Sequence, residues 1–155
     1  MPNPPSPTPP DELWRFIGGY QLPRAPGEQF LYSNLGFGLL AQAMVGRLNA
    51  SEDQLFARII TGPLGFKDTA FELTPAQRAR LAQGFFPNGQ PAPEFEPGYP
   101  ALAGSGGIRS TLNDMMRYLD FELGNVAVPP SALLPVLHQP RHAAGPNGGS
   151  VGLAW

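Results

Sequence analysis

An apolar run over residues 34–48 constrains the fold of this chain more than any other feature. It contains no charged residue before Arg47. A helix that is apolar on nearly all sides is buried, so the run predicts a central buried helix. Gly36, Gly38 and Gly46 each lower its helix propensity relative to Ala. We therefore expect another element to approach this helix closely at these glycines.

A tyrosine, a serine and an asparagine stand where this helix begins. Pro26-Gly27 predicts a turn, residues 28–31 an extended segment, and Ser33 or Asn34 a helix cap. Tyr32 would then lie near the positive end of the helix dipole, which favours a phenolate by only about 0.3–1 kcal/mol. An unperturbed Tyr titrates at about pH 10, so a Tyr base also needs cationic neighbours. Tyr32 is a candidate proton-transfer residue, and a packed Tyr before a capped core helix is the alternative.

Glycines, prolines and capping residues divide the rest of the chain into further helices. The expected helices run from Asp11 to Gly18-Gly19, from Ser51 to Gly62-Pro63, from Thr74 onward, from Thr111 to Leu123 and from Ser131 to His138. A capping box is expected at the start of the second and third of these, over residues 51–54 and 74–77. The prolines of residues 84–100 predict a loop or short hairpin. Residues 151–155 resemble the start of a strand whose partners come later. The predicted fold class is mainly α with little sheet, in which at least four helices pack around residues 34–48.

Composition indicates one folded unit preceded by an arm. The chain has 155 residues and is 42% hydrophobic, which suffices for a single domain. Six of the first ten residues are proline. The expected organisation is a proline-rich arm over residues 1–10 and a single helical domain over residues 11–155.

Charge and cysteine content exclude several classes of function. Only 14% of the residues are charged, the net charge is −2 and Arg is spread evenly, which argues against nucleic-acid binding. The absence of Cys excludes thiolate catalysis and disulfides. No stretch approaches the roughly 18 apolar residues that span a bilayer, so no membrane partner is expected. Residues 1–10 have no apolar run of the kind that a signal peptide needs, and the compartment stays open.

Three segments, in order, resemble the serine β-lactamase-like family, which includes class C β-lactamases, D-alanyl-D-alanine carboxypeptidases and related esterases. Residues 26–40 are similar to its Tyr-x-Asn segment. Residues 63–69 (PLGFKDT) are similar to its PLGM-x-DT segment, and residues 106–115 (GGIRSTLNDM) to its GG-x-x-ST-x-x-DM segment. The matches cover roughly residues 22 to 123, and three in order are far more specific than Tyr-x-Asn alone.

The resemblance implies the helical part of a β-lactamase-like α/β fold and a parent reaction of acyl transfer. In that reaction a Ser attacks an ester, β-lactam or amide, Tyr32 helps to move the proton, and Asn34 binds the substrate. It implies a small-molecule ester or amide substrate and no cofactor. Relatives are commonly exported, which suggests a periplasmic or secreted parent.

Two motifs of the family are missing from the chain. No Ser is followed three residues later by Lys, and Lys67 is the only Lys. A K-T-G strand is also absent. The resemblance therefore implies an internal piece of a family member, and the apolar surface left by a missing domain predicts self-association.

Ser105 offers a second candidate nucleophile. Residues 103–107 resemble the A-x-S-x-G form of a nucleophile elbow, in which a strained strand-to-helix turn exposes a Ser. The next helix begins several residues too late for such an elbow, so a flexible glycine turn is the alternative. The backbone amides around Gly106 and Gly107, together with Asn34, are candidate oxyanion donors.

His138 and His142 are the only histidines, and they stand four residues apart. Pro140 breaks the helix that would align them. No acidic third ligand stands nearby in the sequence, so no metal site is predicted. Asp114 is interpreted as a helix cap rather than an acid.

Three classes of function remain open. The first is a serine-hydrolase fragment with Tyr32 and Asn34 at its site and residual esterase activity. The second is a non-catalytic helical module for binding or structure. The third is a small hydrolase with an improvised site at Ser105 or at His138 and His142.

Overall fold

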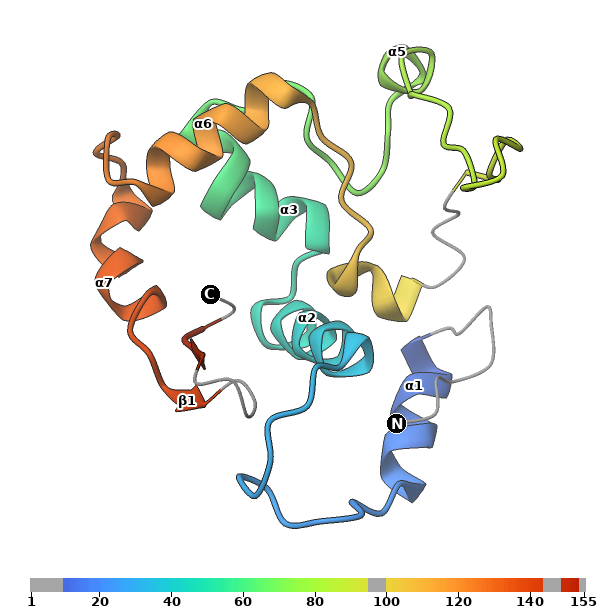
Figure 1. Ribbon diagram of the computed structural model, residues 1–155, viewed down its shortest axis with the longest axis vertical. Coiled ribbons are helices and arrows are strands. Elements are labelled where there is room, and N and C mark those ends of the chain that lie inside the picture. The colour runs from blue at the N-terminus through green and yellow to red at the C-terminus, as the bar shows by residue number, and fades with distance from the viewer. Residues whose placement is uncertain (1–9, 95–99, 144–148, 154–155) are drawn as a thin grey trace.

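The computed structural model describes residues 10–94, 100–143 and 149–153. Helices dominate it, with one two-stranded sheet (Figure 1). This confirms the predicted mainly α fold with little sheet. The helices and strands are α1 (Pro10–Gly19), α2 (Asn34–Leu48), α3 (Glu52–Phe56), the π-helix η1 (Ala57–Thr61), α4 (Gly62–Leu64), α5 (Pro75–Arg78), the 3₁₀ helix η2 (Pro100–Ser105), α6 (Leu112–Glu122), the 3₁₀ helix η3 (Pro129–Leu133), α7 (Leu134–Leu137), β1 (His142–Ala143) and β2 (Ser150–Val151).

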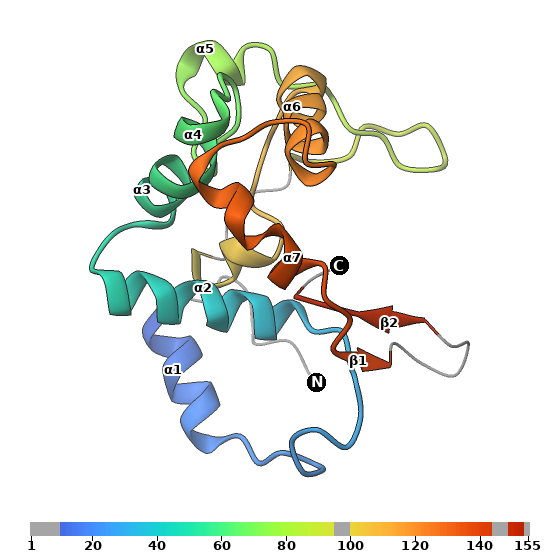
Figure 2. The same ribbon diagram turned by 90° about the vertical axis from the view of Figure 1, so that its left-hand side faces the viewer.

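Helix α2 lies between α1 on one side and α3 and α4 on the other (Figure 2). Its backbone meets η2 directly. A Cβ at Gly38 would lie 2.6 Å from Cδ2 of Leu102, and a Cβ at Gly104 would lie 2.3 Å from Cβ of Ala41. Real side-chain atoms cannot approach so closely, so both positions require Gly. The predicted close approach is confirmed at Gly38.

The same prediction is wrong for the two other glycines of α2. A Cβ at Gly46 would meet nothing within 4 Å, and one at Gly36 would meet only Ser33, at 3.5 Å. Gly36 lies in the first turn and Gly46 in the last, whereas η2 crosses the middle of the helix.

The expectation that α2 is buried is also wrong. Only Leu35 and Gly38 of this helix are buried, and Leu40 is 56% exposed. Helix α1 and η2 pack against α2, and a long face of the helix that neither of them covers stays open. The apolar pattern therefore indicates a helix with two apolar faces, of which this fold covers one.

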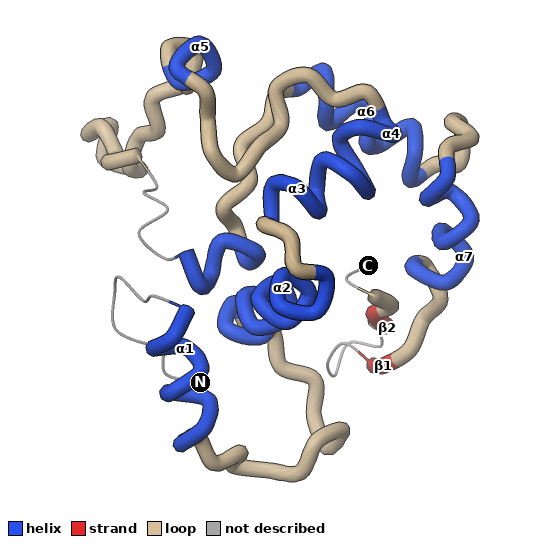
Figure 3. Tube along the Cα trace, turned by 180° about the vertical axis from the view of Figure 1, so that it is seen from behind, coloured by secondary structure: helices blue, strands red, loops and turns tan. Residues whose placement is uncertain are grey.

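The buried side chains form two separate clusters rather than one core of four helices around α2. The first joins α1, α2 and η2 through Leu13, Leu35 and Ala101. The second joins α4, α6 and α7 through Leu64, Phe121 and Leu134. Figure 3, a view from behind, shows α4, α6 and α7 following one another in an arc.

The sequence predicted that the helix beginning after Ser51 ends at Gly62-Pro63. This prediction is wrong, because the helical chain continues past these residues. Ser51 and Gln54 form the predicted capping box. The chain then widens into the π-helix η1, in which the Gly62 amide donates to the Ala57 carbonyl five residues back. Pro63 falls in the first turn of α4, where the missing N–H is tolerated. The helix ends instead at Gly65, whose φ of 67° is left-handed.

The two strands pair antiparallel, with His142 opposite Val151. Within the described residues the partner of β2 therefore precedes it in the chain. A later partner strand stays a prediction. Residues 84–92 form the predicted hairpin, closed by a bridge between Phe85 and Pro91. The proline-rich arm, apart from Pro10, lies outside the described residues. Among the described residues, no helix is long and apolar enough to cross a membrane.

Candidate active site

The Tyr32-Ser33-Asn34 segment forms the N-terminal boundary of α2. Ser33 is the N-cap: its backbone is extended, and its hydroxyl accepts a hydrogen bond from the Gly36 amide at 3.0 Å. Asn34 is the first residue of the helix, and its side chain is exposed. The choice between Ser33 and Asn34 as cap is thus resolved in favour of Ser33.

Tyr32 extends into solvent, and 65% of its surface is exposed. Its ring contacts the ring of Phe37, with centroids 5.9 Å apart and planes tilted by 44°. Its hydroxyl makes no hydrogen bond or ion pair with any residue that the structure describes. Within the described part of the chain, no Lys, Arg or His side chain bonds the Tyr32 hydroxyl.

Ser105 is the last residue of η2 rather than the apex of a strand-to-helix turn. Its hydroxyl donates to the Leu102 carbonyl at 2.7 Å. The amides of Gly106 and Gly107 both donate to the Ala103 carbonyl, at 3.2 and 2.7 Å. In this conformation neither amide is free for an oxyanion, and the Ser105 proton is already engaged with the backbone.

The two histidines occupy different elements. His138 caps the C-terminus of α7, and its Nε2 lies 2.7 Å from Oε2 of Glu122 on α6. His142 lies exposed on β1. Among the described residues, no three His, Asp or Glu side chains gather where they could hold a metal ion.

Glu122 is nearly buried between α6 and α7, since its side chain is only 7% exposed. The Tyr118 hydroxyl bonds the same carboxylate. Burial, followed by this hydrogen bond and the carboxylate charge, raises the pKa of Tyr118 far above its ordinary value. Glu122 therefore joins α6 to α7 through His138, while Tyr118 of its own helix bonds the same carboxylate, a structural role that sequence reasoning missed.

Asp114 is the centre of the contact between two of the recognised segments. Its carboxylate accepts hydrogen bonds from the amides of Lys67 and Asp68, at 3.1 and 2.8 Å, and from the Thr69 hydroxyl at 2.7 Å. The Thr69 hydroxyl also lies 2.7 Å from that of Ser110. Burial raises the Asp114 pKa, but these hydrogen bonds outweigh it and hold the pKa below its ordinary value.

The interpretation of Asp114 as a helix cap therefore needs correction. Thr111 caps α6, because its hydroxyl accepts from the Asp114 amide. The Asp114 side chain instead caps the loop at residues 67–69, more than forty residues away in the sequence. The conclusion that Asp114 is structural rather than an acid catalyst agrees with this geometry.

Arg109 makes a second connection between distant segments that the sequence did not indicate. Its backbone pairs with Ala70 in an antiparallel bridge. Its guanidinium donates to the carbonyls of Phe71 and Gly107, at 3.1 and 3.0 Å, and lies 3.7 Å from the Glu94 carboxylate. The glycine turn after η2 is therefore held by this side chain.

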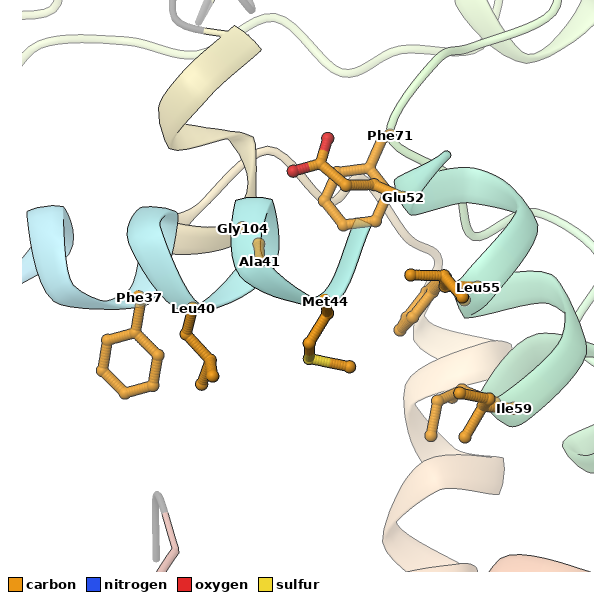
Figure 4. A pocket seen from close by; sticks show the side chains of 11 residues that line it. Phe37, Leu40, Ala41, Met44, Glu52, Leu55, Ile59, Phe71 and Gly104 are labelled. Carbon is orange, nitrogen blue, oxygen red and sulfur yellow. The ribbon is translucent and has the colours of Figure 1, made fainter. Parts of the chain in front are cut away.

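The open face of α2 continues into an apolar groove of about 310 Å³. Figure 4 shows Phe37, Leu40 and Met44 aligned along α2, with Leu55 and Ile59 beside them. Glu52 is the one acidic residue of the lining. Burial, then the charge of Asp53, raises the pKa of Glu52, and a hydrogen bond from Gln42 offsets part of the rise.

A second hollow, of about 380 Å³, lies beside the segment that leads into Tyr32. Residues 27–31 form one wall, and His142 with Ala143 of β1 forms the other. The structure thus places His142 beside residues 27–31, which lead into Tyr32. Sequence reasoning did not find this proximity, because the two segments are more than a hundred residues apart.

The family can be established by comparison with known proteins. A family model described as Beta-lactamase matches residues 1–155, which is the entire chain. The chain therefore belongs to the beta-lactamase family, as its three recognised segments predicted.

Two curated relatives show how much of a family member this chain represents. It is 38% identical over 112 residues to the D-alanyl-D-alanine-carboxypeptidase/endopeptidase AmpH of Escherichia coli (strain K12), covering 70% of this chain and 27% of AmpH. It is 39% identical over 93 residues to the human putative beta-lactamase-like 1, covering 59% of this chain and 18% of that protein. The chain thus spans about a quarter of the length of AmpH.

Comparison with solved structures also matches nearly all of this chain to less than half of a larger protein. A beta-lactamase from Sulfitobacter sp. EE-36 superposes with a TM-score of 0.77 at 27% identity, covering 94% of this chain and 39% of that one. A beta-lactamase/D-alanine carboxypeptidase from Pseudomonas syringae gives a TM-score of 0.82 at 22% identity, covering 96% and 41%. The second likeness bears on the fold alone.

Proposed function

We propose that this chain supplies the Tyr-x-Asn side of a serine acyl-transfer site. Tyr32 moves the proton and Asn34 binds the substrate carbonyl or amide. The observation that carries the proposal is the placement of an exposed phenol and an exposed amide at the N-terminus of α2, in a chain of the beta-lactamase family.

The nucleophile of the proposed reaction comes from residues beyond these 155. The sequence contains no Ser-x-x-Lys, and the backbone of its single Lys, Lys67, is bonded to Asp114. Ser105 is less suited, because its hydroxyl donates to Leu102 and an ordinary Ser needs an adjacent base. An activated Ser together with its Lys would complete the site beside Tyr32.

The proposed substrate is an amide or β-lactam, with activated esters as a secondary substrate. The relative AmpH is named as a D-alanyl-D-alanine-carboxypeptidase/endopeptidase, and the Sulfitobacter neighbour as a beta-lactamase. Activated aryl esters have good leaving groups, so one proton-transfer group beside an apolar surface can suffice for weak hydrolysis of them.

Hydrolysis of p-nitrophenyl acetate tests this proposal with two single substitutions. We expect Tyr32→Phe to lower the hydrolysis rate, after subtraction of the rate in buffer alone, by about tenfold or more. The reason is that a general acid–base group contributes about 10²–10⁴-fold. Ser105→Ala is expected to match the parent. Loss in Ser105→Ala alone would instead favour an improvised nucleophile.

Covalent labelling tests where the nucleophile lies. We expect no adduct on any Ser of these residues after incubation with a penicillin, as read by peptide mass spectrometry. A penicillin adduct on Ser105 would contradict the proposal. A parent rate equal to buffer, unchanged in both variants, would favour a non-catalytic helical module.

A further inference from the structure

Tyr32 and Phe37 stand in a defined relation to the start of α2. Ser33 is the N-cap, so Tyr32 occupies the position before the cap and Phe37 the fourth position of the helix. An apolar contact between these two positions is a hydrophobic staple, which fixes the direction in which the chain enters a helix. The ring centroids lie 5.9 Å apart, within the range of an aromatic pair.

This contact matters because Tyr32 has few other constraints. Its side chain is 65% exposed, and its hydroxyl bonds no residue that the structure describes. Phe37 makes the one ring contact of Tyr32 among those residues. The Ser33 cap holds the backbone on one side of the phenol, and the Phe37 ring holds the phenol itself.

We propose that Phe37 is a positioning residue that sets the orientation of the Tyr32 ring. This rests on the proposed function, in which Tyr32 transfers the proton. A phenol that rotates freely presents its hydroxyl over a wide arc, whereas proton transfer needs it within hydrogen-bond reach of the reacting group. A misplacement of about 1 Å can cost about 100-fold in rate. The Phe37 ring restricts that arc through its contact with the Tyr32 ring.

Proton NMR of the whole chain tests the positioning directly, with Tyr32 signals assigned by their loss in Tyr32→Phe. We expect the Phe37 ring to shift the Tyr32 ring protons and to give cross-relaxation with them. In Phe37→Ala both effects should disappear, and in Phe37→Tyr both should return. Leu48→Ala is the matched control, because Leu48 lies at the far end of α2 with an exposure of 43%, close to the 36% of Phe37. Unchanged Tyr32 signals in Phe37→Ala would overturn the proposal.

A double-mutant cycle on aryl-ester hydrolysis tests the consequence for catalysis. Phe37→Ala should lower kcat by about 3- to 10-fold, the range that an aromatic pair supports, with little change in KM. The same substitution should have no effect in a Tyr32→Phe background, because its effect runs through the phenol. An equal loss in both backgrounds would overturn the positioning role.

Failure of the proposed function can be distinguished from failure of the positioning role of Phe37. If Tyr32→Phe leaves the rate unchanged, Tyr32 is not the proton-transfer group. The NMR comparison of Phe37→Ala with Leu48→Ala still decides whether Phe37 orients the ring. Circular dichroism of both variants, expected to match the parent, separates loss of orientation from loss of the helix.

Discussion

The hydroxyl of Thr69 lies 2.7 Å from a carboxylate oxygen of Asp114, across 45 residues of sequence. This contact gives a physical meaning to two of the segments by which the family is recognised. Each segment contributes one half of the same hydrogen-bonded junction, and neither half is satisfied without the other. The junction attaches the loop after α4 to the first turn of α6 and needs no catalytic role to explain its residue types.

Replacing this carboxylate should destabilise the fold. Asp114→Asn exchanges an acceptor-only group for one whose amide faces two backbone N–H groups, and the residue is only 2% exposed. We expect the free energy of unfolding to fall by about 2 kcal/mol, as measured by urea denaturation. Glu72→Gln, at an exposed position, is the control and should change it by less than about 0.5 kcal/mol. Equal stability of the two variants would contradict this account of the junction.

The same carboxylate predicts a dependence of stability on pH. Its pKa in the folded chain lies below the unfolded value, because its hydrogen bonds outweigh burial. The stabilisation is therefore fully present above the unfolded pKa and is lost as pH falls below about 4. Asp68, whose pKa is lowered chiefly by its hydrogen bond from Arg80, acts in the same direction. Between pH 7 and pH 3 the midpoint temperature of unfolding should fall less steeply in Asp114→Asn than in the parent. An equal slope in the two proteins would contradict the stabilising role of the Asp114 carboxylate.

Two glycines of α2 should respond to Ala with opposite signs. Gly38→Ala drives a methyl group into Leu102 and the Ala101 carbonyl, and we expect a loss of about 1–3 kcal/mol. Gly46→Ala meets open space in a helix, and we expect a gain of about 0.5–1 kcal/mol. Denaturation of the two variants beside the parent provides the measurement. A gain in both would show that α2 and η2 are not in direct contact.

The open face of α2 should make the chain self-associate. Leu40 and Met44 are 56% and 40% exposed and line the same apolar groove. We expect the sedimentation coefficient of the parent to rise with concentration, and Met44→Lys to reduce that rise. Leu112→Glu, on α6 at 76% exposure, is the control for a general gain in charge. A parent that stays monomeric at all concentrations would exclude this prediction.

The sequence predicted those parts of the fold that depend on neighbouring residues. Helix α2 has the predicted bounds because Ser33 caps its start and Asn49, with a left-handed φ of 48°, ends it. The capping boxes at Ser51 and Thr74 formed for the same local reason. The continuation through Gly62-Pro63 was missed, because a π turn depends on how the following residues pack.

The parts that sequence reasoning could not supply are contacts between distant segments. Nothing near Asp114 in the chain identifies residues 67–69 as its partners, and nothing near His142 indicates the hollow beside residues 27–31. Apolar periodicity marks a face that avoids water, but it does not say which element covers that face. For this reason α2 was expected to be buried, although one of its apolar faces stays open.

The contact of Gly38 with η2 has a consequence for altering this protein. Because backbone meets backbone there, the contact that holds α2 in position lies in the middle of the helix rather than at its ends. Movement of α2 along its axis, or rotation about it, would bring side chains into collision with η2. Tyr32 precedes this fixed point by less than two helical turns. We therefore expect changes to the segment over residues 20–31 to disturb the position of the phenol less than a single methyl group at Gly38 does.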